Sequence, residues 1–275
     1  MNLFQVFHGN KNICDIINGV AKNATSGVPA ICACILPHYK LGTVRTLLKD
    51  SKPEFTTQSN GVPCLLLKHA IQMAKDVLSG LECMHEMRFA HRDIKPGNIC
   101  VKRLPLKDQV RLQYIIIDLD AAVVIKKRKM TGSEGFDESE GSQLEEFTGQ
   151  FTSMAGQKLP LGTVSFMSPE HIDPSRLVDG RTDLFSLGVT MFVCLSGRFP
   201  FVQPNSCDVE FLGVRMLQRF AMSREADTLK IADTGAQRRT EEEVVGIIAK
   251  SLLRDRDERY ANADAMKKDL ERIDG

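Results

Sequence analysis

The segment at residues 91–98, HRDIKPGN, brings three kinds of reactive side chain close together in the chain. A carboxylate on a rigid loop, here that of Asp93, can accept the proton of a substrate hydroxyl group. Lys95, two residues later, can offset the negative charge of a phosphate during its transfer, and Asn98 can bind a divalent cation. A solvated surface loop with one salt bridge is the alternative interpretation, and this spacing makes it the weaker one.

A second acidic group, Asp118, stands at the end of a β-type run in the sequence Ile117-Asp118-Leu119-Asp120. Carboxylate oxygens at such a position can hold Mg²⁺ between phosphate groups. Leu119 offers an apolar side chain for packing, and Asp120 adds further negative charge beside the candidate metal site. A strand that ends in a solvated acidic turn is the alternative interpretation.

Taken in order, these motifs resemble those of eukaryotic-type protein kinases of the serine/threonine class. Residues 91–98 fit the catalytic-loop pattern, in which an asparagine follows the aspartate of HRD by five positions. Residues 118–120 resemble the metal-binding DFG element, with leucine for phenylalanine and Asp120 for glycine, and this replacement removes φ freedom at that position. Residues 162–170, GTVSFMSPE, resemble the GTxxYMAPE sequence that closes the activation segment.

The resemblance covers nearly the whole chain, from about residue 13 to about residue 273. The Lys95-Pro96 pair and Thr163 favour the serine/threonine class over tyrosine kinases. The resemblance implies that Asp93 is the catalytic base, that Lys95 is the partner of the phosphate charge, and that Asn98 and Asp118 bind Mg²⁺. It assigns structural or regulatory roles to seven residues, His91, Arg92, Leu119, Thr163, Glu170, Asp183 and Arg259.

Two of these implied roles are specific contacts. Asp183 stands where the family places a buried aspartate at a helix start, which ties down the catalytic loop. Arg259 matches a late arginine that pairs with Glu170 and holds the C-terminal lobe together.

The resemblance also implies a nucleotide site. Residues 29–36, PAICACIL, resemble the last strand of the small lobe, and residues 37–39 resemble the hinge that binds adenine. Leu36 would be the gatekeeper. Pro37 has no backbone N–H, but none is needed for adenine at that position, and Tyr39 supplies the backbone N–H that the adenine requires. Cys100 is the fourth residue expected to bind the cofactor. The implied cofactors are ATP and Mg²⁺, and the implied partner is a protein substrate with a serine or threonine hydroxyl.

The glycine-rich GxGxxG loop, the strand lysine and the helix glutamate of the family are not found in these 275 residues. Lys11 and Lys22 are poor replacements, because Lys11 is expected in a turn and Lys22 near a strand end that faces away. We therefore expect an N-terminally truncated kinase domain of the α+β class. Residues 1–37 would be a remnant β-rich N-lobe, and residues 38–275 the hinge and a complete helical C-lobe.

Two functions remain open at this point. The first is transfer of the γ-phosphoryl group of ATP to serine or threonine. The second is a catalytically impaired pseudokinase, or a truncated fragment, that binds a partner as a scaffold.

The elements that would position these residues follow from hydrophobic periodicity. Residues 65–87 repeat apolar side chains at three- and four-residue steps, which predicts a long helix before the catalytic loop. Strands are predicted at residues 13–20, 29–36, 99–102 and 112–117, and helices at 183–197, 209–220, 241–253 and 262–273, with Gly197 ending the first of these. Strands first and helices afterwards favour the α+β class.

The composition excludes several classes of protein. With 43% hydrophobic and 26% charged residues, the chain is typical of a soluble globular protein. A net charge of +1 argues against nucleic-acid binding through bulk charge, and no apolar run is long enough to span a membrane. No signal peptide is visible, and eight cysteines without a CxxC motif favour reduced thiols in an intracellular compartment. We expect a cytoplasmic protein, or a nuclear one if Lys126–Lys129 acts as a localisation signal, and a flexible activation-segment insertion at about residues 126–160.

Overall fold

The computed structural model describes residues 7–15, 18–23, 29–59, 61–105, 110–125, 163–173, 178–200 and 235–273. The expected insertion at residues 126–160, the basic run at 126–129 and the predicted helix at 209–220 lie outside these residues. Helices and strands are both present, so the α+β class is confirmed.

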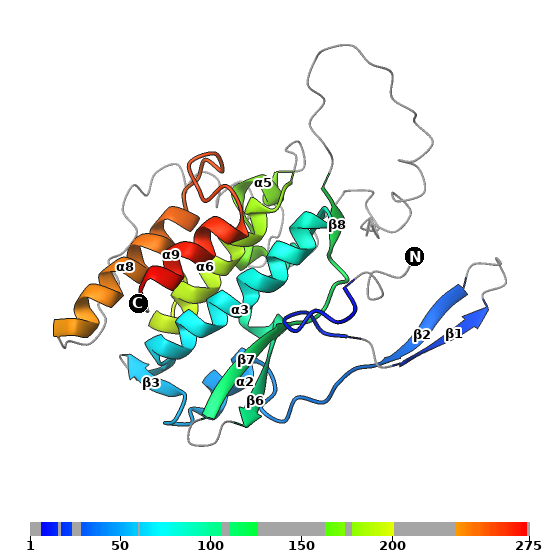
Figure 1. Ribbon diagram of the computed structural model, residues 1–275, viewed down its shortest axis with the longest axis horizontal. Coiled ribbons are helices and arrows are strands. Elements are labelled where there is room, and N and C mark those ends of the chain that lie inside the picture. The colour runs from blue at the N-terminus through cyan, green and yellow to red at the C-terminus, as the bar shows by residue number, and fades with distance from the viewer. Residues whose placement is uncertain are drawn as a thin grey trace, which may run out of the picture.

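The long helix α3 (Leu67–Glu86) packs against elements from distant parts of the chain. It contacts α9 (Ala263–Ile273), α6 (Arg181–Ser196) and strand β7 (Val110–Ile116), as Figure 1 shows. Its buried face follows the helical repeat expected from the sequence, because Met73, Val77, Leu81 and Met84 are all fully buried. The prediction placed its start two residues early, since Leu65 is instead the last residue of strand β4 (Val62–Leu65).

Helix α6 is the buried centre of the helical part, because 13 of its 16 residues are buried. It contacts α3 on one side and α8 (Gly235–Ser251) on another. The helix ends at Gly197, as predicted, where a φ of 72° gives the left-handed cap that glycine adopts without strain.

A close approach at Gly80 joins α3 to the strands. A Cβ atom there would lie 2.8 Å from Cδ1 of Ile116 and 3.1 Å from the carbonyl oxygen of Asn12. Only glycine therefore lets β7 and the turn before Ile13 lie directly on the helix. Ile13 itself forms an isolated bridge with Ile116 and is 3% exposed.

The predicted first strand at residues 13–20 is thus wrong in its bounds. The strand β1 is Asn18–Asn23, and it pairs antiparallel with β2 (Pro29–Ile35) in a hairpin that projects away from the helices in Figure 1. The apolar residue that began the predicted strand belongs to the core against β7 instead.

Strands β6 (Ile99–Pro105) and β7 form an antiparallel pair in which Ile99 lies opposite Ile116. The segment 91–98 leads into β6, and Asp118 follows β7. One further backbone hydrogen bond, from the N–H of Ile117 to the carbonyl of Asn98 (3.0 Å), extends the pairing. The two candidate metal-binding positions are therefore brought to the same end of one hairpin.

Several short elements complete the described fold and were not predicted. Helix α2 (Val44–Asp50) begins at a capping box between Thr43 and Thr46, and β3 (Thr56–Ser59) pairs with β4. Strand β5 (Phe89–Ala90) pairs with β8 (Val123–Val124), and the short helix α5 (Pro169–Ile172) precedes α6. Across the described segments, no helix is both long enough and apolar enough to cross a membrane.

Candidate active site

The carboxylate of Asp93 is held by three donors from two separate segments. Its Oδ2 accepts from Nζ of Lys95 at 2.5 Å and from Nδ2 of Asn98 at 2.8 Å. Its Oδ1 accepts the backbone N–H of Thr163 at 2.9 Å. An ionised carboxylate has about four lone-pair positions, so about one remains for a further donor.

Lys95 and Thr163 join the two segments a second time. Nζ of Lys95 donates to the hydroxyl of Thr163 at 2.7 Å, while its side chain keeps 24% of its surface exposed. Lys95 therefore presents its charge both to Asp93 and to the open side of the site.

His91 fixes the backbone beneath Asp93. It is fully buried, and its ring bonds the carbonyl of Ile117 through Nε2 (3.1 Å) and the N–H of Asp93 through Nδ1 (3.2 Å). These two contacts require the neutral ring with its proton on Nε2, since Nδ1 must accept. One side chain thus ties the loop at 91–98 to the end of β7.

Asp183, in the first turn of α6, anchors the start of the same loop. Its carboxylate accepts the backbone N–H groups of His91 (2.9 Å) and Arg92 (2.7 Å). It also accepts from Nε2 of His85, at the end of α3, at 2.8 Å. Burial alone would raise the pKa of Asp183, but the hydrogen bond from His85 and those from the loop N–H groups hold that pKa below its usual value.

Two of the four non-glycine residues with a positive φ in the described part of the chain lie at this site. Arg92 and Asp118 each have a φ of 65°, in the left-handed region that side chains other than glycine rarely adopt. Such strain of roughly 1–3 kcal/mol persists only where surrounding contacts impose it. For Arg92 those contacts are the bond to Asp183 and one from its Nε to the carbonyl of Ala121, at 2.6 Å.

The segment 118–120 corrects one sequence argument. Leu119 is 3% exposed and packs in the main core, whereas the side chains of Asp118 and Asp120 are exposed. The left-handed residue is Asp118, and Asp120 has no positive φ. The replacement of glycine at position 120 therefore removes no backbone freedom that this conformation uses.

The donor set at the end of the hairpin fits a magnesium ion. Both amide contacts of Asn98 go from Nδ2 to Asp93, to its carbonyl (3.0 Å) and its Oδ2, which leaves Oδ1 for another partner. The exposed carboxylate of Asp118 supplies further oxygen atoms. Mg²⁺ prefers such oxygen ligands and completes its shell with water and phosphate oxygens, so one carboxylate and one amide oxygen suffice.

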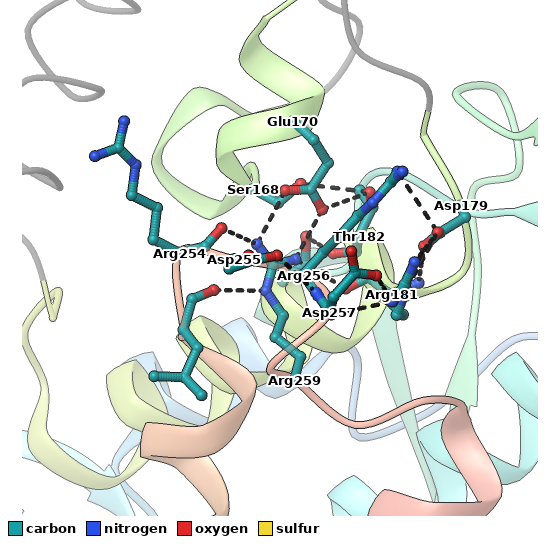
Figure 2. Close-up of polar contacts among 12 residues, drawn as sticks. Ser168, Glu170, Asp179, Arg181, Thr182, Arg254, Asp255, Arg256, Asp257 and Arg259 are labelled. Carbon is teal, nitrogen blue, oxygen red and sulfur yellow. Dashed lines mark hydrogen bonds and ion pairs between the residues drawn. The ribbon is translucent and has the colours of Figure 1, made fainter.

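A buried ion pair joins α5 to the segment between α8 and α9. Figure 2 shows Arg259, in the segment between α8 and α9, directed at Glu170 of α5. The guanidinium donates from Nη1 to Oε1 at 2.7 Å and from Nη2 to Oε2 at 2.9 Å, and the two side chains are 0% and 3% exposed. Burial would raise the pKa of Glu170, but the hydrogen bonds and charge of Arg259 hold it below its usual value.

The environment of His171, which lies next to Glu170, could not be predicted from the sequence. His171 is 6% exposed, and neither ring nitrogen has a hydrogen-bond partner within the described part of the chain. Burial, followed by the positive charge of Arg92, lowers the pKa of His171 to about 4. The ring is therefore neutral at physiological pH.

The hinge residues border a cavity of about 490 Å³. Pro37 and Tyr39 line this cavity, but Leu36 does not, and Leu36 is 45% exposed. Cys100 is buried beneath the hinge in a cluster with Cys14 and Ile115, against which Tyr39 packs. Of the four residues expected to bind the cofactor, two line the cavity, Cys100 lies in the buried cluster against which Tyr39 packs, and Leu36 is left at the surface.

Three polar residues of this site were missed from sequence. His85 bonds Asp183, the hydroxyl of Thr190 donates to the carbonyl of Ile94 (3.3 Å), and the hydroxyl of Ser186 donates to the carbonyl of Phe166 (2.8 Å). Thr190 and Ser186 carried one signal, since they are polar residues within an otherwise apolar helix. His85 carried none.

Comparison with known proteins identifies what this arrangement resembles. A family model described as "Protein kinase domain" matches residues 35–270. The chain is 27% identical over 204 residues to the serine/threonine-protein kinase PksC of Streptomyces coelicolor, which covers 74% of this chain and 29% of that protein.

Two further relatives are similar at the same level. The probable serine/threonine-protein kinase PknB of Bifidobacterium longum is 27% identical, over 72% of this chain and 23% of its own length. Mitogen-activated protein kinase kinase 1 of Arabidopsis thaliana is 27% identical, over 66% of this chain and 43% of its own length. The matched region therefore spans less than half the length of each of these relatives.

Proposed function

Because the chain belongs to the protein kinase domain family, we propose that it transfers the γ-phosphoryl group of ATP to serine or threonine hydroxyls of a protein substrate. The observation that carries the proposal is the Asp93 carboxylate, held by Lys95, Asn98 and Thr163 with about one acceptor position remaining. A carboxylate fixed in this way is suited to receive a substrate hydroxyl.

Each residue then has a role that its contacts support. Asp93 orients the substrate hydroxyl and accepts its proton as the oxygen attacks phosphorus. Lys95 places its positive charge beside the phosphoryl group during the transfer, and its hydrogen bond positions the Asp93 carboxylate. Thr163 positions both of them, because its N–H bonds Asp93 and its hydroxyl bonds Lys95.

Asn98 and Asp118 would hold Mg²⁺ through Oδ1 and the carboxylate, respectively. When bound, the ion neutralises charge on the phosphate oxygens. Pro37 and Tyr39 would contact the adenine ring from the hinge, and Cys100 would lie under it. Asp183 and His91 act through the backbone of the loop and are positioning residues.

We also propose a domain organisation and a cellular location. Residues 1–37 would belong to the small lobe, and residues 38–275 to the hinge and large lobe. The unpaired thiols of Cys14, Cys64 and Cys194 are compatible with a reducing intracellular compartment, and we propose a cytoplasmic location.

The test is incubation of the full chain with labelled ATP, Mg²⁺ and a library of serine, threonine and tyrosine peptides. We expect label on serine and threonine peptides that requires Mg²⁺. Thermal unfolding in the same buffer separates the alternatives, because ATP bound to the folded state raises Tm. A chain that neither labels any peptide nor gains Tm with ATP and Mg²⁺ is a scaffold, and the proposal is then wrong.

A further inference from the structure

The cavity beside the hinge carries a concentration of positive charge. Four cationic side chains line it, those of Lys11, Lys40, Lys102 and Arg103, against a single carboxylate, Asp15. Over the whole chain, by contrast, the cationic and acidic residues number 36 and 35. The excess of cations is therefore a property of this cavity and not of the chain.

Three of these cations are available to a ligand. Lys11, Lys40 and Lys102 are exposed, and their ammonium groups form no ion pair with any other residue the structure describes. Arg103 is paired with Glu54 at 2.8 Å and lies 5.5 Å from the ring centroid of Phe55. Arg103 is thus a wall of the cavity, and the three lysines are its binding groups.

The carboxylate of Asp15 can balance at most one of the four cationic charges. Its Oδ1 lies 3.2 Å from Nδ1 of His8, and its Oδ2 accepts the backbone N–H of Gly9 at 3.3 Å. Both oxygens are therefore used within the turn that carries Asp15.

The walls of the cavity are fixed to one another by backbone hydrogen bonds. The N–H of Gly42 donates to Tyr39 (2.8 Å), that of Val101 donates to Gly42 (2.9 Å), and that of Cys14 donates to Ile116 (2.8 Å). The hinge, β6, β7 and the N-terminal turn are joined in this way. A ligand would enter a largely preformed site, which reduces the entropy lost on binding.

The position of the lysines separates them from the phosphoryl chemistry. Lys102 lies four residues beyond Asn98 along β6, and a strand rises about 3.3 Å per residue, which places its Cα roughly 13 Å from that of Asn98. The strand runs away from Asp93 in this direction. An anion held here is therefore not the phosphoryl group that reacts at the loop.

The floor of the cavity is apolar. Ile13 and Ile115 are 3% and 4% exposed, and Val101 and Leu41 add further apolar side chains to the lining. A ligand complementary to this surface has acidic groups at its edges and an apolar group at its centre.

From this charge complementarity we propose that the cavity is a docking site for an acidic peptide segment of a protein partner, in which carboxylates on either side of an apolar residue meet Lys11, Lys40 and Lys102. The cavity shares Pro37 and Tyr39 with the proposed adenine contact, but Asp93, Asn98 and Asp118 are not part of its lining, and peptide binding does not depend on phosphoryl transfer.

Fluorescence anisotropy tests this in the absence of ATP and Mg²⁺, with a labelled Glu-Asp-Leu-Glu-Asp peptide and a Gln-Asn-Leu-Gln-Asn peptide as the neutral match. We expect the acidic peptide alone to bind. Its affinity should fall as salt rises from about 50 to about 300 mM, because screening weakens attraction between exposed charges.

The double variant Lys40→Glu/Lys102→Glu should weaken this binding by about tenfold or more, because like charges then face each other. The control is Lys49→Glu/Lys68→Glu, which changes the net charge equally at two exposed lysines outside the cavity lining. This control should bind as the unaltered chain does, and circular dichroism should show that both variants are folded.

Four outcomes would overturn the proposal: equal binding of the neutral peptide, unchanged affinity in the cavity variant, equal loss in the control variant, or equal binding of a thymidine oligonucleotide of the same charge. Loss of the rise in Tm with ATP in the Lys40→Glu/Lys102→Glu variant, but not in the control variant, would assign the lysines to a nucleotide and overturn the proposal as well.

Discussion

Replacing Arg259 by leucine would leave the carboxylate of Glu170 buried with only hydroxyl groups as side-chain donors, those of Thr182 at 3.1 Å and of Ser168. The arginine makes five hydrogen bonds, two to Glu170 and three to the carbonyls of Leu253, Arg181 and Arg254. Removing one partner of such a buried pair costs about 3–5 kcal/mol, because an uncompensated charge stays in the interior.

This loss is a large part of the 5–15 kcal/mol by which a domain is ordinarily stable. We expect the variant to unfold roughly 10 °C below the unaltered chain. The chain has no tryptophan, so circular dichroism of the helices is the appropriate signal for urea and thermal unfolding.

Arg272→Leu is the matched control, since Arg272 pairs with Asp269 at the surface, with 77% of its side chain exposed. That variant should lose under about 1 kcal/mol. The double variant Glu170→Leu/Arg259→Leu should recover part of the loss, because no unpaired charge remains. An Arg259→Leu variant no less stable than Arg272→Leu would refute the argument that this pair supports the fold.

Three other substitutions test separate parts of the structure. Gly80→Ala should cost about 1–3 kcal/mol in urea unfolding, because its Cβ would overlap β7, whereas Gly246→Ala, with open space around it, should be neutral or stabilising; equal effects would contradict the close packing. His171 has a pKa of about 4 in the folded protein and an ordinary value near 6.5. Above about pH 6.5 the ring is neutral in both states, so His171 should not lower the free energy of unfolding there. That free energy should fall by up to about 3 kcal/mol as the pH drops to about 4, and His171→Leu should remove this increment; an unchanged pH dependence in that variant would contradict the assignment. Asp183→Asn replaces one acceptor oxygen by a donor facing the loop N–H groups, so phosphoryl transfer should fall at least about tenfold; unaltered transfer would show that the anchor is dispensable.

The parts of the fold that follow strong local patterns could be predicted from the sequence. Helix α3 repeats a buried apolar face over 20 residues, and Gly197 supplies the left-handed cap that ends α6. Helix α2 was missed because it has seven residues and only two of them, Val44 and Leu47, are buried, which is too short for a periodic signal. Strand β4 was missed because its buried end at Leu65 continues into the apolar start of α3 without a break.

The candidate site also has parts that local sequence patterns predict and parts that they do not. Asp93, Lys95 and Asn98 are close in the chain, so their spacing alone indicates their chemistry. The contact between His85 and Asp183 joins residues 98 positions apart and depends on how the end of α3 meets the start of α6. Ile13 begins an apolar run, which predicts a strand. In the structure Ile13 packs in the core instead, because Gly80 has no side chain to fill the space beside it. Such contacts follow from packing between distant elements and carry no local signal.

The central claim is that the Asp93 carboxylate carries the reaction, and the most direct measurement compares phosphoryl transfer from ATP to a serine peptide by Asp93→Asn and by Asp50→Asn. The second substitution makes the same chemical change at an exposed residue of α2. We predict that Asp93→Asn loses about 10²–10⁴-fold in rate, the contribution typical of a positioned base, with little change in Tm, while Asp50→Asn retains full activity. Equal rates for the two variants would contradict the account.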